Sequence, residues 1–176
     1  FGVVISFAVV ALNNPGKSMP FLLVVMDALI IALGANAVNL LDVKPGRAIK
    51  GFTFAIVVIV GVSLAMRPRT SLDPMTAWLI VPFVLWALAS WPYDLGCRAM
   101  TGDAGSNVLG AVLGLTLVWE LSPSSRFIAF LVLIAYHAVA ELGSISAIIQ
   151  RVPPLRALDN FGVRLLAPSN KETEEE

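Results

Sequence analysis

Long apolar runs separated by short polar segments dominate the pattern of this chain. Most of these runs approach the roughly 20 residues that an α-helix needs to cross a bilayer. None shows the strict alternation of apolar and polar residues that is typical of a membrane β-strand. We therefore predict an all-α, polytopic transmembrane bundle with about five complete spans after a first helix that is cut short. The runs are residues 1–12, 20–42, 51–66, 74–91, 105–121 and 125–150.

Single residues refine the predicted spans. Asp73 lies just before the 74–91 run, where its carboxylate can cap the free N–H groups of a helix. Pro82 predicts a kink within that helix, which a membrane bundle tolerates. Gly110 and Gly114 put two small residues on one face, so a neighbouring helix can approach closely.

The chain changes character after residue 150. A pair of prolines at 153–154 interrupts the last long run, and the apolar residues that follow recur at helical spacing up to Phe161. This spacing predicts a short amphipathic helix at the membrane interface. We predict one membrane-embedded domain over residues 1–166 and a disordered acidic tail over 167–176.

Composition narrows the classes of function. Of the 176 residues, 57% are hydrophobic and 14% are charged, and the formal net charge is zero. Soluble domains carry roughly 25% charged residues. A neutral chain without a basic stripe has no electrostatic footprint for nucleic acid. Cys97 is the only cysteine in this sequence, which excludes an internal disulfide and a cysteine-rich zinc site.

The basic residues predict which loops face the cytoplasm. With five spans, the 43–50 loop, the 92–104 loop and the carboxy terminus lie on one side. That side holds eight of the 12 lysines and arginines. Cytoplasmic loops carry the excess of these residues, so we predict that this side is cytoplasmic in a multi-pass protein of the cell membrane. Arg67 and Arg69 on the other side argue against this orientation.

A first polar patch closes the 20–42 run. Asn36, Asn39 and Asp42 are three residues apart, and at about 100° per residue their side chains spread over about 120° of one helix face. Two carboxamides and a carboxylate can coordinate a metal or hydrogen-bond a sugar and its phosphates. They can equally be solvated residues of a helix end.

A second polar patch is the glycine-bearing turn over 102–107. Free backbone N–H groups and the positive end of the helix dipole favour a phosphate at such a turn. Asp103 adds an oxygen ligand of the kind that Mg²⁺ prefers. The alternative is an ordinary helix cap by Asp103 or Ser106, worth about 1 kcal/mol. Since two spans separate Asp42 from Asp103, both patches fall on the same side.

Together the two patches resemble the motifs of the polyprenyl-phosphate N-acetylhexosamine-1-phosphate transferases. This family, glycosyltransferase family 4, includes the phospho-MurNAc-pentapeptide translocase of peptidoglycan synthesis. Members carry Asn-x-x-Asn-x-x-Asp at a helix end and Gly-Asp-x-Gly-Ser in the next cytoplasmic loop. The matching residues here are Asn36, Asn39, Asp42, Gly102, Asp103, Gly105 and Ser106. The likeness covers most of the chain coarsely and suggests the carboxy-terminal portion of such an enzyme.

The resemblance implies an activity and a role for each matched residue. Such an enzyme transfers a sugar-1-phosphate from a UDP-sugar to a polyprenyl phosphate, such as undecaprenyl phosphate, in cell-wall or surface-polysaccharide biosynthesis. Asp42 and Asp103 would be catalytic and would bind Mg²⁺. The residues implied for substrate binding are Asn36, Asn39, Gly102, Gly105 and Ser106, with Lys44 and Arg47 as cations near the lipid phosphate. A solvated basic loop explains these two cations equally well, and a homodimer is left open.

The chain also departs from the family pattern. Pro45 stands where members usually have the second acid of Asp-Gly-x-Asp-Gly. Met100 and Thr101 stand where members often have an aromatic residue that can stack on uracil. The family's histidine- or arginine-rich last loop is replaced by residues 151–156, and its paired aspartates would lie before Phe1. A catalytically inactive relative that serves as a structural membrane subunit is therefore one alternative.

Acidic residues inside the predicted spans keep an ion-coupled transporter as a second alternative. An unpaired charge at mid-bilayer costs at least about 2.5 kcal/mol, so each acid should find a partner. We expect Asp27 to bond another helix, Glu120 to be structural, and His137 and Glu141, four residues apart, to satisfy each other. A transporter would place its polar groups near the midplane. Here the strongest polar patches lie at helix ends, which favours an interfacial enzyme.

Overall fold

The computed structural model describes Ser6, Ala8 and residues 20–66 and 72–162. Within these residues every regular element is a helix, which confirms the predicted all-α fold. The helices are α2 (Phe21–Asn39), α3 (Arg47–Met66), α4 (Pro74–Leu95), α5 (Gly102–Glu120), α6 (Pro123–Leu142), α7 (Ile145–Arg151) and α8 (Pro153–Asn160). Apart from Ser6 and Ala8, the predicted first helix lies outside the described residues, as does the predicted acidic tail at 167–176.

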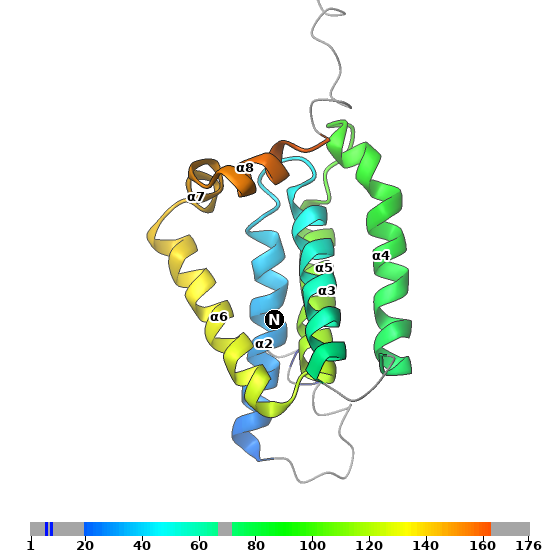
Figure 1. Ribbon diagram of the computed structural model, residues 1–176, viewed down its shortest axis with the longest axis vertical. Coiled ribbons are helices and arrows are strands. Elements are labelled where there is room, and N and C mark those ends of the chain that lie inside the picture. Colours follow the sequence, from blue (N-terminus) through cyan, green and yellow to red (C-terminus); the bar gives the residue numbers. More distant parts are fainter. Residues whose placement is uncertain (1–5, 7, 9–19, 67–71, 163–176) are drawn as a thin grey trace, which may run out of the picture.

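Four helices in the described part of the chain are long and apolar enough to cross a membrane: α2, α3, α4 and α6. With α5 they form an upright bundle in which α4 stands on one side and α6 on the other (Figure 1). The two outer helices expose large apolar side chains, among them Trp78 on α4 and Ile128 on α6. Large apolar side chains suit contact with lipid. The backbone of each helix can also lie in lipid, because its N–H and C=O groups are hydrogen-bonded within the helix. This is the architecture of a multi-pass membrane protein.

The closest helix packing joins α2 to α5 through glycine. A Cβ atom added to Gly34 would lie 2.8 Å from the carbonyl oxygen of Gly110 and 3.2 Å from the Cα of Gly114. No side chain fits between these backbones, which confirms the close approach predicted at Gly110 and Gly114. In lipid, where helices gain little from hydrophobic burial, such van der Waals contact holds them together.

Two apolar clusters flank this glycine contact. Phe52 of α3 and Leu109 of α5 are fully buried in one cluster, which also includes α4. Ile30 of α2 and Val118 of α5 belong to the other, against which α6 packs. Helix α5 thus takes part in both clusters, so its first turn has a defined position relative to the ends of α2, α3 and α4.

Helix α4 follows the predicted pattern. The Asp73 carboxylate accepts a hydrogen bond from the Met75 backbone N–H (2.9 Å), which confirms the predicted cap. The helix continues through Pro82 and extends to Leu95, past the predicted end at residue 91.

The predicted helix over 125–150 is wrong, because two helices occupy this range. Helix α6 ends at Leu142, Gly143 is extended, and the Ser144 hydroxyl accepts a hydrogen bond from the Ala147 N–H (3.3 Å) to start α7. An N-cap serine has a non-helical backbone, and its hydroxyl accepts a hydrogen bond from a free N–H of the first helical turn. Ser144 therefore favours the start of a new helix at this point. Helices α7 and α8 then lie across the end of the bundle (Figure 1). Helix α8 confirms the predicted short helix after the proline pair.

Two of the acids within the spans have partners on other elements. Asp27 of α2 accepts a hydrogen bond from the guanidinium of Arg126 on α6 (2.7 Å). Glu120 accepts a hydrogen bond from the Ser63 hydroxyl of α3 (2.6 Å). Both contacts confirm the expectation that these acids bind neighbouring helices.

The predicted pairing of His137 with Glu141 is wrong. The Nδ1 atom of His137 lies 2.8 Å from the Leu133 carbonyl oxygen, one turn earlier in α6. Glu141 is exposed. A ring N–H reaches a carbonyl of its own helix without reorienting a second long side chain, so the local contact prevails.

Candidate functional site

The two polar patches meet at the end of the bundle that α7 and α8 cross. The Ser106 hydroxyl oxygen of α5 lies 2.8 Å from the Asn39 carboxamide oxygen, at the last residue of α2. It also lies 2.9 Å from the Gly102 carbonyl oxygen. One hydroxyl proton serves one acceptor at a time, and rotation of the Asn39 amide lets its NH₂ donate to Ser106 instead. Residues 67 positions apart in the sequence are thus in direct contact. The number of spans between the two motifs predicted only that they share a side.

Three carboxylates gather at this end. Asp42 lies in the turn after α2, Asp103 in the exposed first turn of α5, and Asp94 is buried near the end of α4. Burial raises the pKa of Asp42, and the negative charges of Asp94 and Asp103 raise it further, while the Gly102 backbone opposes them. The three carboxylates therefore share one electrostatic environment that favours a cation.

Two carboxylate oxygens here are candidate ligands for a metal. The Oδ1 atoms of Asp42 and Asp94 are buried and accept no hydrogen bond within the described residues. Buried oxygens of this kind call for an ion or water. Mg²⁺ uses one or two carboxylates and completes its shell with water and phosphate oxygens. Among the described residues, no group of three or more His, Cys, Asp or Glu side chains is placed to hold a metal ion.

Sequence reasoning missed Asp94. Its Oδ2 atom accepts a hydrogen bond from the Thr101 hydroxyl (3.3 Å), so it ties the end of α4 to the residue that precedes α5. The signal was present, because Asp94 is an acid at the end of an apolar helix and lies in the 92–104 segment that was already assigned to this side.

The turn before α5 needs glycine for conformational reasons. Gly102 has a φ of +69°, a region that L side chains rarely adopt. An added Cβ would meet nothing within 4 Å, so space is not the constraint. The N-cap residue of α5 is Thr101, and its side chain makes no capping hydrogen bond. The Ser106 hydroxyl faces carbonyl acceptors, so the capping alternative for Asp103 or Ser106 is wrong. The Gly102 backbone instead hydrogen-bonds the Asp42 carboxylate.

Three other residues predicted to bind substrate, Gly105, Asn36 and Lys44, differ in their surroundings and exposure. At Gly105, a Cβ would lie 2.9 Å from the Thr101 methyl group, so only a very small residue fits. Asn36 is exposed, and no hydrogen bond joins it to Asn39 or Asp42 in the part of the chain that the structure describes. Lys44 is exposed as well.

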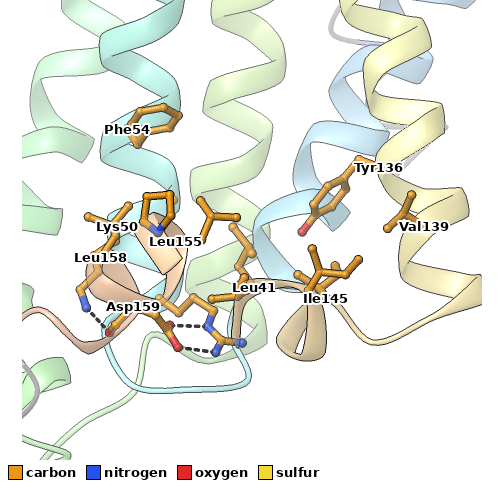
Figure 2. A pocket seen from close by; sticks show the side chains of 14 residues that line it. Leu41, Lys50, Phe54, Tyr136, Val139, Ile145, Leu155, Leu158 and Asp159 are labelled. Atoms are coloured by element: carbon orange, nitrogen blue, oxygen red, sulfur yellow. Dashed lines mark hydrogen bonds and ion pairs between the residues drawn. The ribbon is translucent and has the colours of Figure 1, made fainter. Parts of the chain in front are cut away.

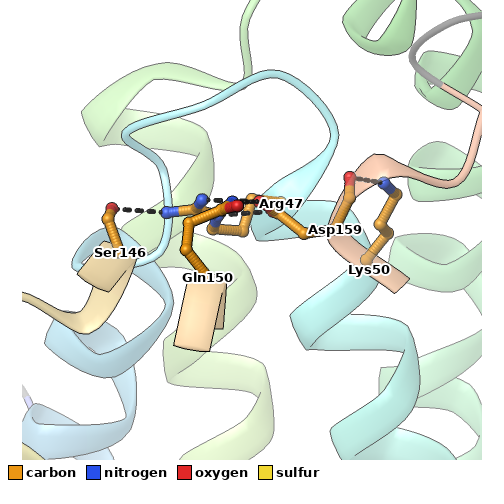
Figure 3. Close-up of polar contacts among 5 residues, drawn as sticks. All are labelled: Arg47, Lys50, Ser146, Gln150 and Asp159. Carbon is orange, nitrogen blue, oxygen red and sulfur yellow. Dashed lines mark hydrogen bonds and ion pairs between the residues drawn. The ribbon is translucent and has the colours of Figure 1, made fainter. Parts of the chain in front are cut away.

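Arg47 is not a solvated loop residue, because it is buried at the start of α3. Its Nε and Nη2 atoms donate to the two carboxylate oxygens of Asp159 on α8 (2.8 and 2.9 Å), and Nη1 donates to the Ser146 hydroxyl (2.8 Å). Lys50 donates to the Asp159 backbone carbonyl (2.7 Å) and Gln150 to its carboxylate (3.0 Å). Figure 3 shows these donors converging on one residue. The Arg47 hydrogen bonds lower the pKa of Asp159, and the charges of Lys44 and Lys50 add to this effect.

An apolar cavity of about 470 Å³ adjoins this ion pair. Its walls come from α3, α6, α7 and α8, with Phe54, Val139, Ile145 and Leu155 among the side chains around it (Figure 2). Arg47, Lys50 and Asp159 are the charged residues of its lining. The cavity therefore combines an apolar interior with two buried cations, which suits a molecule with an anionic head and an apolar chain.

Protein-family models, curated proteins and solved structures were all compared with this chain, and none of them matches it. The likeness to a transferase family therefore rests on the two sequence motifs and the helix pattern.

Proposed function

We propose that this chain belongs to a Mg²⁺-dependent phosphoglycosyl transferase, which moves a sugar-1-phosphate from a UDP-sugar to a polyprenyl phosphate. One observation carries this proposal: the Ser106 hydroxyl lies 2.8 Å from Asn39, so the two family-like motifs form one site. In the proposed orientation this end of the bundle, with the 43–50 and 92–104 segments, faces the cytoplasm, where nucleotide-sugars are found.

The carboxylates and the Gly102 turn suit the nucleotide-sugar. Asp42 and Asp103, with Asp94 beside them, would hold Mg²⁺ together with diphosphate oxygens, and the ion would offset the charge of the phosphates. The first N–H groups of α5 provide donors and the positive end of a helix dipole for the same diphosphate. Asn39 and Ser106 position these two elements relative to each other.

The apolar cavity suits the lipid acceptor. Its interior would hold the first isoprene units of the chain, and Arg47 and Lys50 would face the phosphate. Lys50 interacts electrostatically with both Asp159 and Asp94, so the cations adjoin the carboxylate site. Transfer requires an oxygen of the lipid phosphate to approach the sugar-bearing phosphorus in line with the departing UMP. Cations beside the nucleophile and a metal beside the diphosphate support that approach.

The intramembrane acids support the enzyme over the transporter. Asp27 and Glu120 each bind a side chain of another helix, which is the structural role of a buried acid rather than that of an ion-coupling site.

Transfer by the full-length protein tests the proposal. UMP release should require Mg²⁺, a UDP-sugar and a polyprenyl phosphate together, and Asp103→Asn should abolish it because an amide is a poorer Mg²⁺ ligand. Asp73→Asn is the matched control, since it changes an aspartate at the opposite end of the bundle and asparagine still caps a helix. If the parent releases no UMP with any nucleotide-sugar tested, the transferase proposal is wrong.

A further inference from the structure

Asp159 fills a donor site whose geometry suits a phosphate as well as a carboxylate. Arg47 and Lys50 are 4% and 7% exposed. They converge on Asp159 together with Gln150, and the Ser146 hydroxyl accepts a further hydrogen bond from Arg47 (Figure 3). An arginine fork binds carboxylate and phosphate by the same pair of parallel hydrogen bonds. Arg47 pairs with the Asp159 carboxylate, and Lys50 interacts electrostatically with both Asp159 and Asp94. A phosphate monoester carries about −1.5 to −2 at pH 7, so in place of Asp159 it would bring more negative charge to the two cations.

The position of Asp159 connects this donor site to the apolar cavity. Leu155 and Leu158 of α8 line the cavity, and Asp159 lies next to them at its charged end. One short helix thus supplies both an apolar wall and the anion. Most residues of α8 are exposed, but the side chain of Asp159 is only 7% exposed, so the ion pair is the main polar anchor that holds this helix against α3.

The energetics of buried ion pairs favour an exchange of partners. Removing two charges from water costs nearly as much as their attraction returns, so such pairs often add little net stability. Replacing Asp159 by another anion keeps Arg47 paired, whereas simple loss of Asp159 would leave a buried charge without a partner. A competing anion can therefore release α8 at low cost.

We propose that Arg47 and Lys50 bind the phosphate of an anionic lipid, that Asp159 occupies this site in the absence of the lipid, and that helices α7 and α8 form a latch which the lipid phosphate opens by displacing Asp159. The identity of the lipid as a polyprenyl phosphate rests on the proposed function. The latch itself is tested by binding alone.

Binding of farnesyl phosphate to the full-length protein in lipid nanodiscs gives the first test. Asp159→Asn removes the competing charge, so affinity should increase at least about threefold, as expected when a closed state is removed from the equilibrium. Glu141→Gln is the matched control, because it neutralises an exposed acid at the same end of the bundle and should leave affinity unchanged. Arg47→Lys loses the fork and should weaken binding in the parent and in the Asp159→Asn background. Unchanged or weaker binding by Asp159→Asn would overturn the latch.

Two further ligands show whether the site binds a lipid phosphate or free phosphate. Farnesol lacks the phosphate and inorganic phosphate lacks the chain, so both should bind at least about tenfold more weakly if head and chain contribute together. Equal binding of inorganic phosphate and farnesyl phosphate would exclude a lipid as the ligand.

Hydrogen exchange tests the latch on the parent protein, so the result does not depend on whether a variant folds. Farnesyl phosphate should accelerate amide exchange over residues 153–160, because α8 loses its anchor, and farnesol should not. Slower or unchanged exchange would contradict an opening latch. The two proposals fail separately, since absence of UMP release with faster exchange rejects the transferase alone, and UMP release without faster exchange rejects the latch alone.

Discussion

The Ser106 hydroxyl oxygen of α5 lies 2.8 Å from the carboxamide oxygen of Asn39 at the end of α2. Ser106 is fully buried, and its hydroxyl also lies 2.9 Å from the Gly102 carbonyl oxygen, so it joins the end of α2 to the first turn of α5. The contact lies between the two motifs that resemble those of the transferase family, and its loss should be measurable in both stability and function.

Ser106→Ala should lower the stability of the protein and weaken binding of the UDP-sugar. Removing one partner leaves the Asn39 amide without its hydrogen bond, at a cost of about 1–3 kcal/mol. The melting temperature in detergent and the KM for the UDP-sugar measure the two effects. Ser124→Ala, at an exposed serine of α6, is the control and should change neither. A Ser106→Ala protein with the melting temperature of the parent would show that the contact contributes little.

Asp42→Asn should stabilise the metal-free protein at pH 7 while abolishing its stabilisation by Mg²⁺. The pKa of Asp42 is raised by burial and by the nearby charges of Asp94 and Asp103. Relative to the unfolded chain, this carboxyl adds stability below about pH 4, the ordinary range of aspartate, and that stability is lost as pH rises through the raised pKa. Asparagine mimics the neutral form at every pH.

Thermal unfolding with and without Mg²⁺ and a UDP-sugar, repeated between pH 4 and 8, measures this effect. A ligand that binds only the folded state raises the melting temperature, and the ionised carboxylate is the form that binds metal. The Mg²⁺-dependent increase should therefore disappear as pH falls through the raised pKa of Asp42. An increase that is the same at all these pH values, or that survives in Asp42→Asn, would remove Asp42 from the metal site.

Gly110→Ala should destabilise the bundle, whereas Gly61→Ala should not. A Cβ at residue 110 would collide with the backbone of α2 at Gly34 and Ala35, and overpacking of this kind costs about 1–3 kcal/mol. Gly61, in α3, has open space around its added Cβ, so alanine there should be neutral or stabilising by up to about 1 kcal/mol. Melting temperatures of the two variants in the same detergent give the comparison. Equal temperatures would contradict the close contact between α2 and α5.

Lys44→Cys and the natural Cys97 should react with a membrane-impermeant thiol reagent from the same side of the membrane. Both positions are exposed, and they lie in the two segments that we place in the cytoplasm. In right-side-out vesicles neither should be labelled, and in inverted vesicles both should be. Labelling of the two cysteines from opposite sides would rule out a site shared by the two motifs.

The sequence alone determined the all-helical fold and most of its helices, the cap at Asp73, the glycine contact of α5 and the same-side placement of Asp42 and Asp103. It did not determine the break between α6 and α7. Each of these follows from local chemistry, since a chain in lipid must satisfy its own backbone and therefore forms helices wherever apolar runs are long enough. The number of spans between two motifs then places them on the same or opposite sides.

Only the tertiary structure decided which polar groups meet. Asp94 of α4 comes close enough to raise the pKa of Asp42, and the guanidinium of Arg47 pairs with Asp159, 112 residues away. His137 turned to the Leu133 carbonyl instead of Glu141. A buried polar side chain takes whichever partner the packed helices bring within about 3 Å. That distance depends on how whole helices pack, which residue spacing along one helix does not specify.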